Sequence, residues 1–167
     1  ASSYLVEFRG VDTDIAAKFA SLFFVGITMG RLLSGFIADR VGDKLLIRYG
    51  IVIIVIGVIL VGIPFRNSTV ALAGLIIIGL GCAPVYPSVI HATPANFGKE
   101  NSQSIIGIQM ASAYVGTTFM PPLFGLIADN IHIGLYPIYL LALAALMLIM
   151  SETMNVKLAN KNAKVNA

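Results

Sequence analysis

The sequence has few of the residues on which soluble and secreted proteins depend. Only 11% of its 167 residues are charged, it has a single cysteine, Cys82, and it has no tryptophan. A soluble domain carries about 25% charged residues, and one cysteine cannot form a disulfide framework. The 11 Lys and Arg residues are too sparse for a nucleic-acid surface. These absences exclude a soluble domain, a disulfide scaffold and a nucleic-acid-binding protein.

The chain also lacks the short motifs of common enzymes. It contains no P-loop, H-E-x-x-H, C-x-x-C or G-x-S-x-G pattern. Transport driven directly by nucleotide hydrolysis is therefore unsupported within this chain. We expect no catalytic residues, no metal site and no cofactor beyond a coupling ion.

Long hydrophobic runs dominate what is present, because 57% of the residues are hydrophobic. A helix needs about 20 residues to cross a bilayer. Uncharged or nearly uncharged runs predict complete spans at about 19–38, 46–65, 70–94, 104–128 and 133–151. Residues 1–9 read as the end of a further span, so we interpret Ala1 as an internal cut. The Ile and Val run at 51–56 does not alternate as a barrel strand would. The sequence predicts an all-α membrane protein.

Basic residues are unevenly divided between the two sides of these spans. Cytoplasmic loops carry more Lys and Arg than external ones. One side collects seven basic residues and the other three: Arg40, Lys44, Arg48, Lys99, Lys157, Lys161 and Lys164 against Arg9, Lys18 and Arg66. This count places the 39–44 loop and a polar tail, residues 155–167, in the cytoplasm.

The chain repeats part of itself at an offset of 90 residues. The core of the repeat reads G-F-I-A-D at 35–39 and G-L-I-A-D at 125–129. The copies lie three spans apart, so they end on opposite sides of the membrane. Two inverted three-helix units are typical of secondary transporters. The alternative is that small residues recur because they help helices to pack.

The loop at 35–44, G-F-I-A-D-R-V-G-D-K, resembles the G-x-x-x-D-R-x-G-R-K motif of the major facilitator superfamily. The resemblance implies the C-terminal half of that fold, with residues 1–154 forming the end of helix seven and helices eight to twelve, and with the N-terminal six-helix half absent. Asp43 stands where the motif has a basic residue, which weakens a gate contact there. The implied gating residues are Gly35, Asp39, Arg40, Gly42 and Lys44, with Gly125 and Asp129 as their counterparts in the repeat.

More narrowly, the segments 2–7 and 26–31 are similar to the fucose-permease-like group of sugar–cation symporters. The resemblance implies alternating-access transport of a sugar or similar small polar solute, coupled to H⁺ or Na⁺. It also implies a multi-pass protein of the bacterial cytoplasmic membrane whose partners are the lipid bilayer and the missing half. Two alternatives remain: a dimeric half-transporter, and a non-transporting scaffold or sensor.

Several polar residues within the spans are candidates for a solute cavity. An intramembrane arginine costs about 2.5–3.5 kcal/mol, so Arg31 faces a cavity or a partner, or extends toward the cytoplasm. Prolines in 70–94 remove backbone hydrogen bonds, which predicts an interrupted, cavity-lining helix around Tyr86. In the next span the candidates are Gln109, Tyr114 and Thr117.

Overall fold

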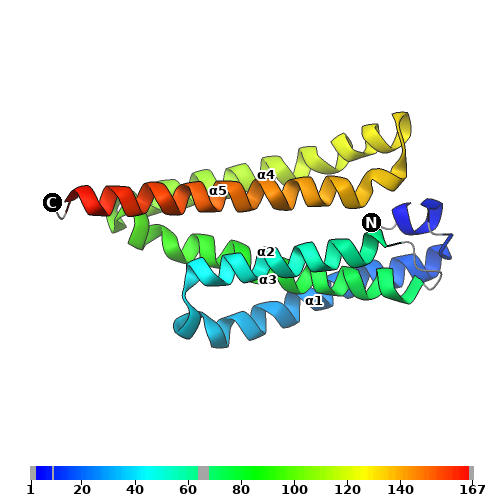
Figure 1. Ribbon diagram of the computed structural model, residues 1–167, viewed down its shortest axis with the longest axis horizontal. Helices are drawn as coiled ribbons and strands as arrows, with labels where there is room; N and C mark the ends of the chain where they lie inside the picture. Colours follow the sequence, from blue (N-terminus) through cyan, green and yellow to red (C-terminus); the bar gives the residue numbers. More distant parts are fainter. Residues whose placement is uncertain (1–2, 9, 64–67, 166–167) are drawn as a thin grey trace.

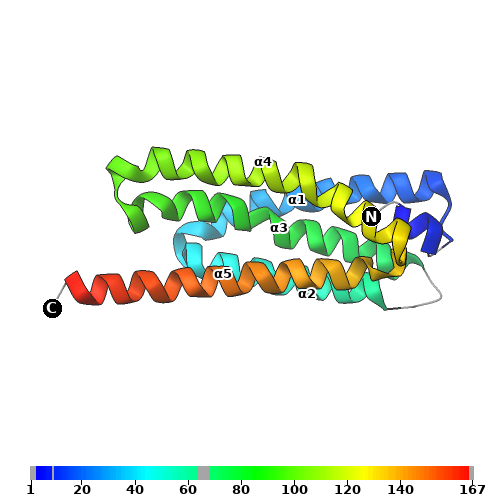
Figure 2. The same ribbon diagram turned by 90° about the horizontal axis from the view of Figure 1, so that it is seen from above.

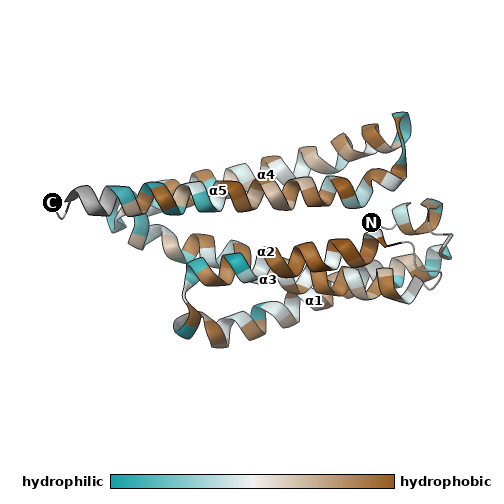
Figure 3. Cartoon of the chain, viewed as in Figure 1, coloured by the Kyte–Doolittle hydropathy of each residue, from teal (hydrophilic) through white to brown (hydrophobic). Residues whose placement is uncertain are grey.

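The computed structural model describes residues 3–8, 10–63 and 68–165, and the described chain is helical almost throughout. Five described helices are long and apolar enough to cross a membrane. Figure 3 shows that hydrophobic residues fill most of the bundle's length. The expected all-α membrane fold is confirmed. In chain order the elements are η1 (Tyr4–Phe8), α1 (Thr13–Val41), α2 (Asp43–Gly62), α3 (Ser68–Phe97), α4 (Lys99–Asn130), η2 (Ile133–Leu135) and α5 (Tyr136–Val165).

The long helices run along one axis, so the connections gather at two ends (Figure 1). Gly42, Gly98 and the last turns of α5 lie at one end, called here the Gly42 end. The elements η1 and η2 lie at the opposite end, called here the His132 end. α1 runs toward the Gly42 end and α4 runs away from it. The two copies of the repeated motif therefore end at opposite ends of the bundle, as the odd number of spans predicts.

Single glycines make two of the turns at the Gly42 end. Gly42 has φ +80° and Gly98 has φ +87°, a backbone region that is costly for residues with a Cβ. Each glycine N–H donates to a carbonyl four residues back, Ala38 O at 2.9 Å and Pro94 O at 3.0 Å. The polar connections expected at 39–44 and 95–104 are thus reduced to one residue each, and the helices are longer than the predicted spans.

Glycines also let α3 pack closely between α1 and α2 (Figure 2). A Cβ on Gly81 would lie 2.6 Å from the carbonyl oxygen of Gly50, and one on Gly74 would lie 2.8 Å from that of Gly57. Such distances leave no room for a side chain. Small residues that bring helix backbones together are the main packing device inside membranes. These three helices form the tightly packed part of the bundle.

The prolines of α3 do not interrupt it, which differs from the sequence expectation. The helix is continuous from Ser68 to Phe97 with Pro84, Pro87 and Pro94 inside it. Pro84 cannot donate to the carbonyl of Leu80. That carbonyl lies against α1 at Gly30, where a Cβ would come within 2.9 Å of the oxygen. Because a neighbouring helix covers the freed carbonyl, the backbone can stay helical.

α4 and α5 lie along the other side of the bundle (Figures 1 and 2). α5 packs on α2, and α4 meets the end of α3. None of the residues of α4, all of them described, is buried. α5 continues to Val165, so most of the predicted 155–167 tail is helical.

Candidate functional site

A cleft at the Gly42 end combines part of the loop motif with the proline-bearing half of α3. Its volume is about 270 Å³. α1 contributes Arg31 at the level where an intramembrane cation was expected. Ser88 of α3, only 5% exposed, brings a hydroxyl to the wall. The described lining is Arg31, Ser34, Gly35, Asp43, Pro84, Pro87, Ser88 and His91.

The single-glycine turn at Gly42 positions the carboxylate of this cleft. Because α2 starts directly after the turn, Asp43 occupies its first turn, where the helix dipole favours a negative charge. Asp43 Oδ2 lies 2.9 Å from Nδ1 of His91 in α3. The Asp43 side chain is 21% exposed and that of His91 is 78% exposed. The position that departs from the loop motif therefore does make a contact.

Arg31 supplies the cleft's cation. Its side chain is exposed, and it lines the cleft one helical turn before Gly35. Across the described residues, no ion pair to the Arg31 guanidinium is recorded. An exposed guanidinium that makes no ion pair within the described chain is suited to bind a carboxylate or phosphate through two parallel hydrogen bonds.

Of the other loop-motif residues, Gly35 lines the cleft, and Arg40, Gly42 and Lys44 are absent from its described lining. Arg40 is exposed, and the Asp39 side chain lies outside the described residues. Lys44 and Gly42 line a neighbouring cavity of about 410 Å³ against the end of α3. Gly35 has no described atom within 4 Å of where its Cβ would stand. No close helix approach is thus seen at Gly35 within the described chain.

The polar candidates of α3 and α4 do not join Arg31. Tyr86 is 39% exposed and Tyr114 is 73% exposed, and neither belongs to the described lining of the cleft. The Thr117 hydroxyl donates to its own helix, at the carbonyl of Tyr114. Gln109 Nε2 donates to the hydroxyl of Thr93, a residue only 1% exposed, at 3.1 Å. Gln109 therefore joins α4 to α3 in this structure.

The second copy of the motif lines a separate cavity at the His132 end. Its volume is about 540 Å³, and its lining includes Gly125 and Asp129 of α4 together with Glu7 of η1. Aromatic rings fill part of its wall: Tyr136 lies 5.2 Å from Tyr4 and 5.3 Å from Phe124 between ring centroids. This aromatic cluster ties η1, α4 and α5 together.

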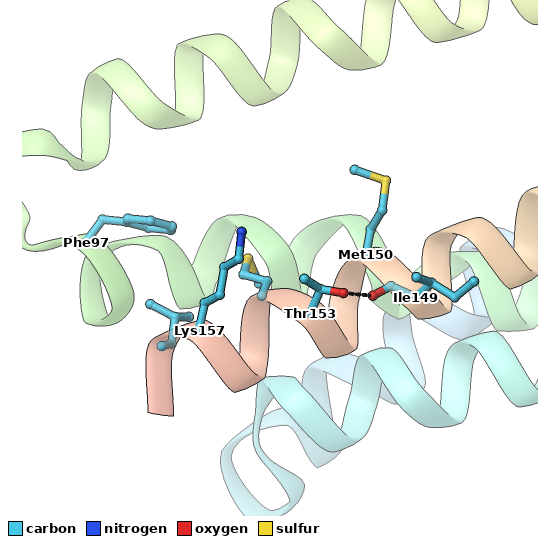
Figure 4. A pocket seen from close by; sticks show the side chains of 7 residues that line it. Phe97, Ile149, Met150, Thr153 and Lys157 are labelled. Atoms are coloured by element: carbon cyan, nitrogen blue, oxygen red, sulfur yellow. Dashed lines mark hydrogen bonds between the residues drawn. The ribbon is translucent and has the colours of Figure 1, made fainter. Parts of the chain in front are cut away.

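A third cavity, of about 500 Å³, lies beside the last turns of α5 (Figure 4). Apolar side chains, among them Phe97 and Met150, line most of it, and Lys157 reaches its edge. The Thr153 hydroxyl donates to the carbonyl of Ile149 at 2.7 Å, so it presents no free donor. The cavity is a mostly apolar space between the end of α3 and the last turns of α5, unlike the polar cleft around Arg31.

Arg48 and Glu152 form an ion pair that our sequence reasoning missed. The two side chains come from the Gly42 ends of α2 and α5. The signal was present, since opposite charges stand at the ends of two spans on the same predicted side. In the part of the chain that the structure describes, no group of three or more His, Cys, Asp or Glu residues could hold a metal ion.

Comparisons with known proteins place this chain among membrane transporters. Monocarboxylate transporter 9 of Mus musculus is 30% identical over 121 residues, covering 71% of this chain and 23% of the relative. A triacylglyceride transporter of Mycolicibacterium smegmatis is 25% identical over 124 residues, covering 64% of this chain and 22% of the relative. A triacylglyceride transporter of Mycolicibacterium hassiacum is 27% identical with similar coverage. No solved structure gives a significant match.

These relatives bear on the sequence expectations in two ways. The chain spans about a fifth of their length, and they carry the names of lipid and monocarboxylate transporters and not of sugar symporters. The similarity to the fucose-permease-like group therefore receives no support from them. The family model of the Major Facilitator Superfamily matches residues 2–161. The chain is a multi-pass integral membrane protein and belongs to the major facilitator superfamily, a family of transporters and not of enzymes.

Proposed function

We propose that this chain is the C-terminal six-helix half of a secondary transporter that moves a small organic anion by alternating access. The inverted placement of the two motif copies supports this, because such repeats exchange roles as the carrier opens to each side. The absence of buried residues in α4 supports a partner bundle, since it leaves a long helix face uncovered. We place the Gly42 end in the cytoplasm from the excess of basic residues there.

Arg31 is the observation that carries the proposal. It is a permanent cation within a span, it lines a cleft, and no ion pair to it is recorded in the described chain. An uncompensated charge at that depth is costly, and a carboxylate solute would compensate it. The similarity to a relative named as a monocarboxylate transporter points the same way. A sugar would depend more on aromatic rings, yet Tyr86 lies outside the described cleft lining.

We propose that a proton or sodium gradient drives the transport. The spans described here carry no acidic residue in their central portions, so the carboxylate that binds the driving ion belongs to the N-terminal half. This assignment explains why the described spans contain Arg31 as a cation for the substrate but no carboxylate for the driving ion.

Uptake by the full-length protein in proteoliposomes tests the proposal. We expect gradient-driven uptake of a radiolabelled monocarboxylate, abolished by Arg31→Gln and retained at a raised KM by Arg31→Lys. Lys18→Gln is the matched control, because Lys18 is an exposed cation of the same helix outside the described cleft lining, and it should leave uptake unchanged.

Other outcomes would replace the proposal. Gradient-driven uptake of fucose that is indifferent to Arg31→Gln would restore the sugar assignment. Saturable uptake by vesicles holding residues 1–167 alone would favour a dimeric half-transporter. Absence of uptake for carboxylates, sugars and lipids in a folded full-length protein would favour a scaffold or sensor.

A further inference from the structure

We propose that His91 and Asp43 form a protonation-dependent latch that holds the Gly42 end of the cleft closed while His91 is charged. The proposal rests on the proposed function, because it assigns a regulatory contact to the same cleft. The latch joins the start of α2 to the last third of α3. Its release lets the end of α3 move and widens the space around Arg31.

One side of the latch is fixed and the other can move. Asp43 follows the Gly42 turn directly, and the N–H of Leu46 bonds back to the Gly42 carbonyl at 3.1 Å. The carboxylate is thus held by the turn and is mostly buried. His91 lies beyond Pro84 and Pro87, each of which removes a backbone hydrogen bond from α3. Prolines are the usual places where helices bend.

Protonation changes the strength of this contact. Histidine is the side chain whose charge ordinarily changes between about pH 5 and pH 8. A charged imidazole donates a charge-assisted hydrogen bond to the Asp43 carboxylate, which is stronger than the bond from a neutral ring. Stability of the closed latch is therefore present at low pH and is lost as the pH rises through the titration of His91.

The described charged groups near the pair come from α1 and α2. Arg31 of α1 lines the same cleft, Arg40 lies on the last turn of α1, and Lys44 of α2 lies on the far side of Asp43. All three are cations that oppose the charged imidazole, and among the described side chains the Asp43 carboxylate, 2.9 Å from Nδ1, favours it. Lys99 and Glu100, in the first turn of α4, are absent from the described lining of both cavities.

The internal repeat does not carry the acidic residue of the latch. At the offset of 90 residues, Asp43 corresponds to Ile133, which carries no charge. The loop motif has a basic residue at the position of Asp43, so this chain has the opposite charge there. The proposed pH response is therefore assigned to the Gly42 end.

Cysteine accessibility measured without solute tests the latch. Ser88 is buried and lines the cleft, so Ser88→Cys in a Cys82→Ala background of the full-length protein reports opening. We expect the modification rate of this cysteine to rise between about pH 5.5 and about pH 8. The rise should be about fivefold larger than in the matched His91→Lys background, a difference that the free energy of an exposed ion pair allows. His91→Lys keeps a permanent cation and should stay closed.

Two further backgrounds separate the latch from a structural role. In Asp43→Asn the cysteine at position 88 should be as accessible at low pH as at high pH. Asp43→Glu keeps the carboxylate and should keep the pH response. Size-exclusion elution like that of the parent shows that each variant is folded. The proposal is wrong if the response is absent from the parent or persists in Asp43→Asn. Because no solute is present, failure of carboxylate uptake would refute the proposed function without changing this result.

Discussion

Arg48 in α2 and Glu152 in α5 form a bidentate ion pair, with Nε 2.5 Å from Oε1 and Nη2 2.6 Å from Oε2. The pair joins helices whose residues are 104 positions apart in the chain. It lies near the Gly42 end, where α5 continues beyond the part that packs on α2. Both side chains are partly exposed, so water and salt weaken their attraction.

We expect Arg48→Ala or Glu152→Ala to lower the thermal midpoint of the purified protein by a few degrees at most, because exposed pairs contribute little. The swapped pair Arg48→Glu with Glu152→Arg should recover part of the loss, since attraction is restored. Thermal unfolding at low and high salt is the measurement. A loss of equal size at high salt would show that packing of the side chains, and not charge, joins the two helices.

The glycine contacts between α2 and α3 predict a large effect of one methyl group. Gly81→Ala places a Cβ 2.6 Å from Gly50 O, and overpacking of this kind costs about 1–3 kcal/mol or more. Gly116→Ala is the matched control, because no described atom lies within 4 Å of its Cβ position. Size-exclusion profiles after heating compare the two. Equal stability of both variants would contradict the close approach of α2 and α3.

Gln109 is expected to act through structure. Gln109→Leu removes the hydrogen bond to Thr93, whose hydroxyl still donates to Val89 O at 2.9 Å. We expect a loss of about 0.5–1.5 kcal/mol, and Thr93→Val combined with it should cost less than the sum of the two. A raised KM for the solute with unchanged stability would instead show that Gln109 contacts the solute.

Gly35 and Gly125 are expected to control opposite ends. Neither glycine has a described atom within 4 Å of its Cβ position. A leucine at either position therefore chiefly affects the approach of a segment that packs against the bundle there. Gly35→Leu should favour the state that is open at the Gly42 end, and Gly125→Leu the state open at the His132 end. A difference of about 1.4 kcal/mol shifts the ratio tenfold. Accessibility of cysteines from each side measures it, and shifts in the same direction would contradict the repeat argument.

The helices could be predicted from the sequence because long apolar runs leave the backbone no other arrangement in lipid. Their ends could not, since each depends on tertiary geometry. The residues at 39–44 do not by themselves indicate that Gly42 alone makes the turn. The positive φ of Gly42 in the structure shows it. The proline-rich part of α3 was expected to be interrupted because prolines remove backbone hydrogen bonds. The sequence does not show that α1 covers the freed carbonyl of Leu80.

The site was only partly predictable for a related reason. Arg31 stood out because charge within a span is rare. The contact between Asp43 and His91 depends on how far α3 is displaced along α2, which the sequence pattern does not specify. Gln109 was predicted to face the solute cavity, and its amide donates instead to Thr93 of α3. Which partner satisfies a polar group is decided by packing.

The uneven packing of the bundle has a consequence for its biogenesis. α1, α2 and α3 can settle against one another through their glycines as soon as the third has entered the membrane. α4 buries none of its residues, so after synthesis it stays in contact with lipid until another membrane segment covers it. Its exposed face, which includes Tyr114, is in contact with hydrocarbon until then. The first three helices therefore find their packing partners within the described chain, whereas burial of α4 has to come from another membrane segment.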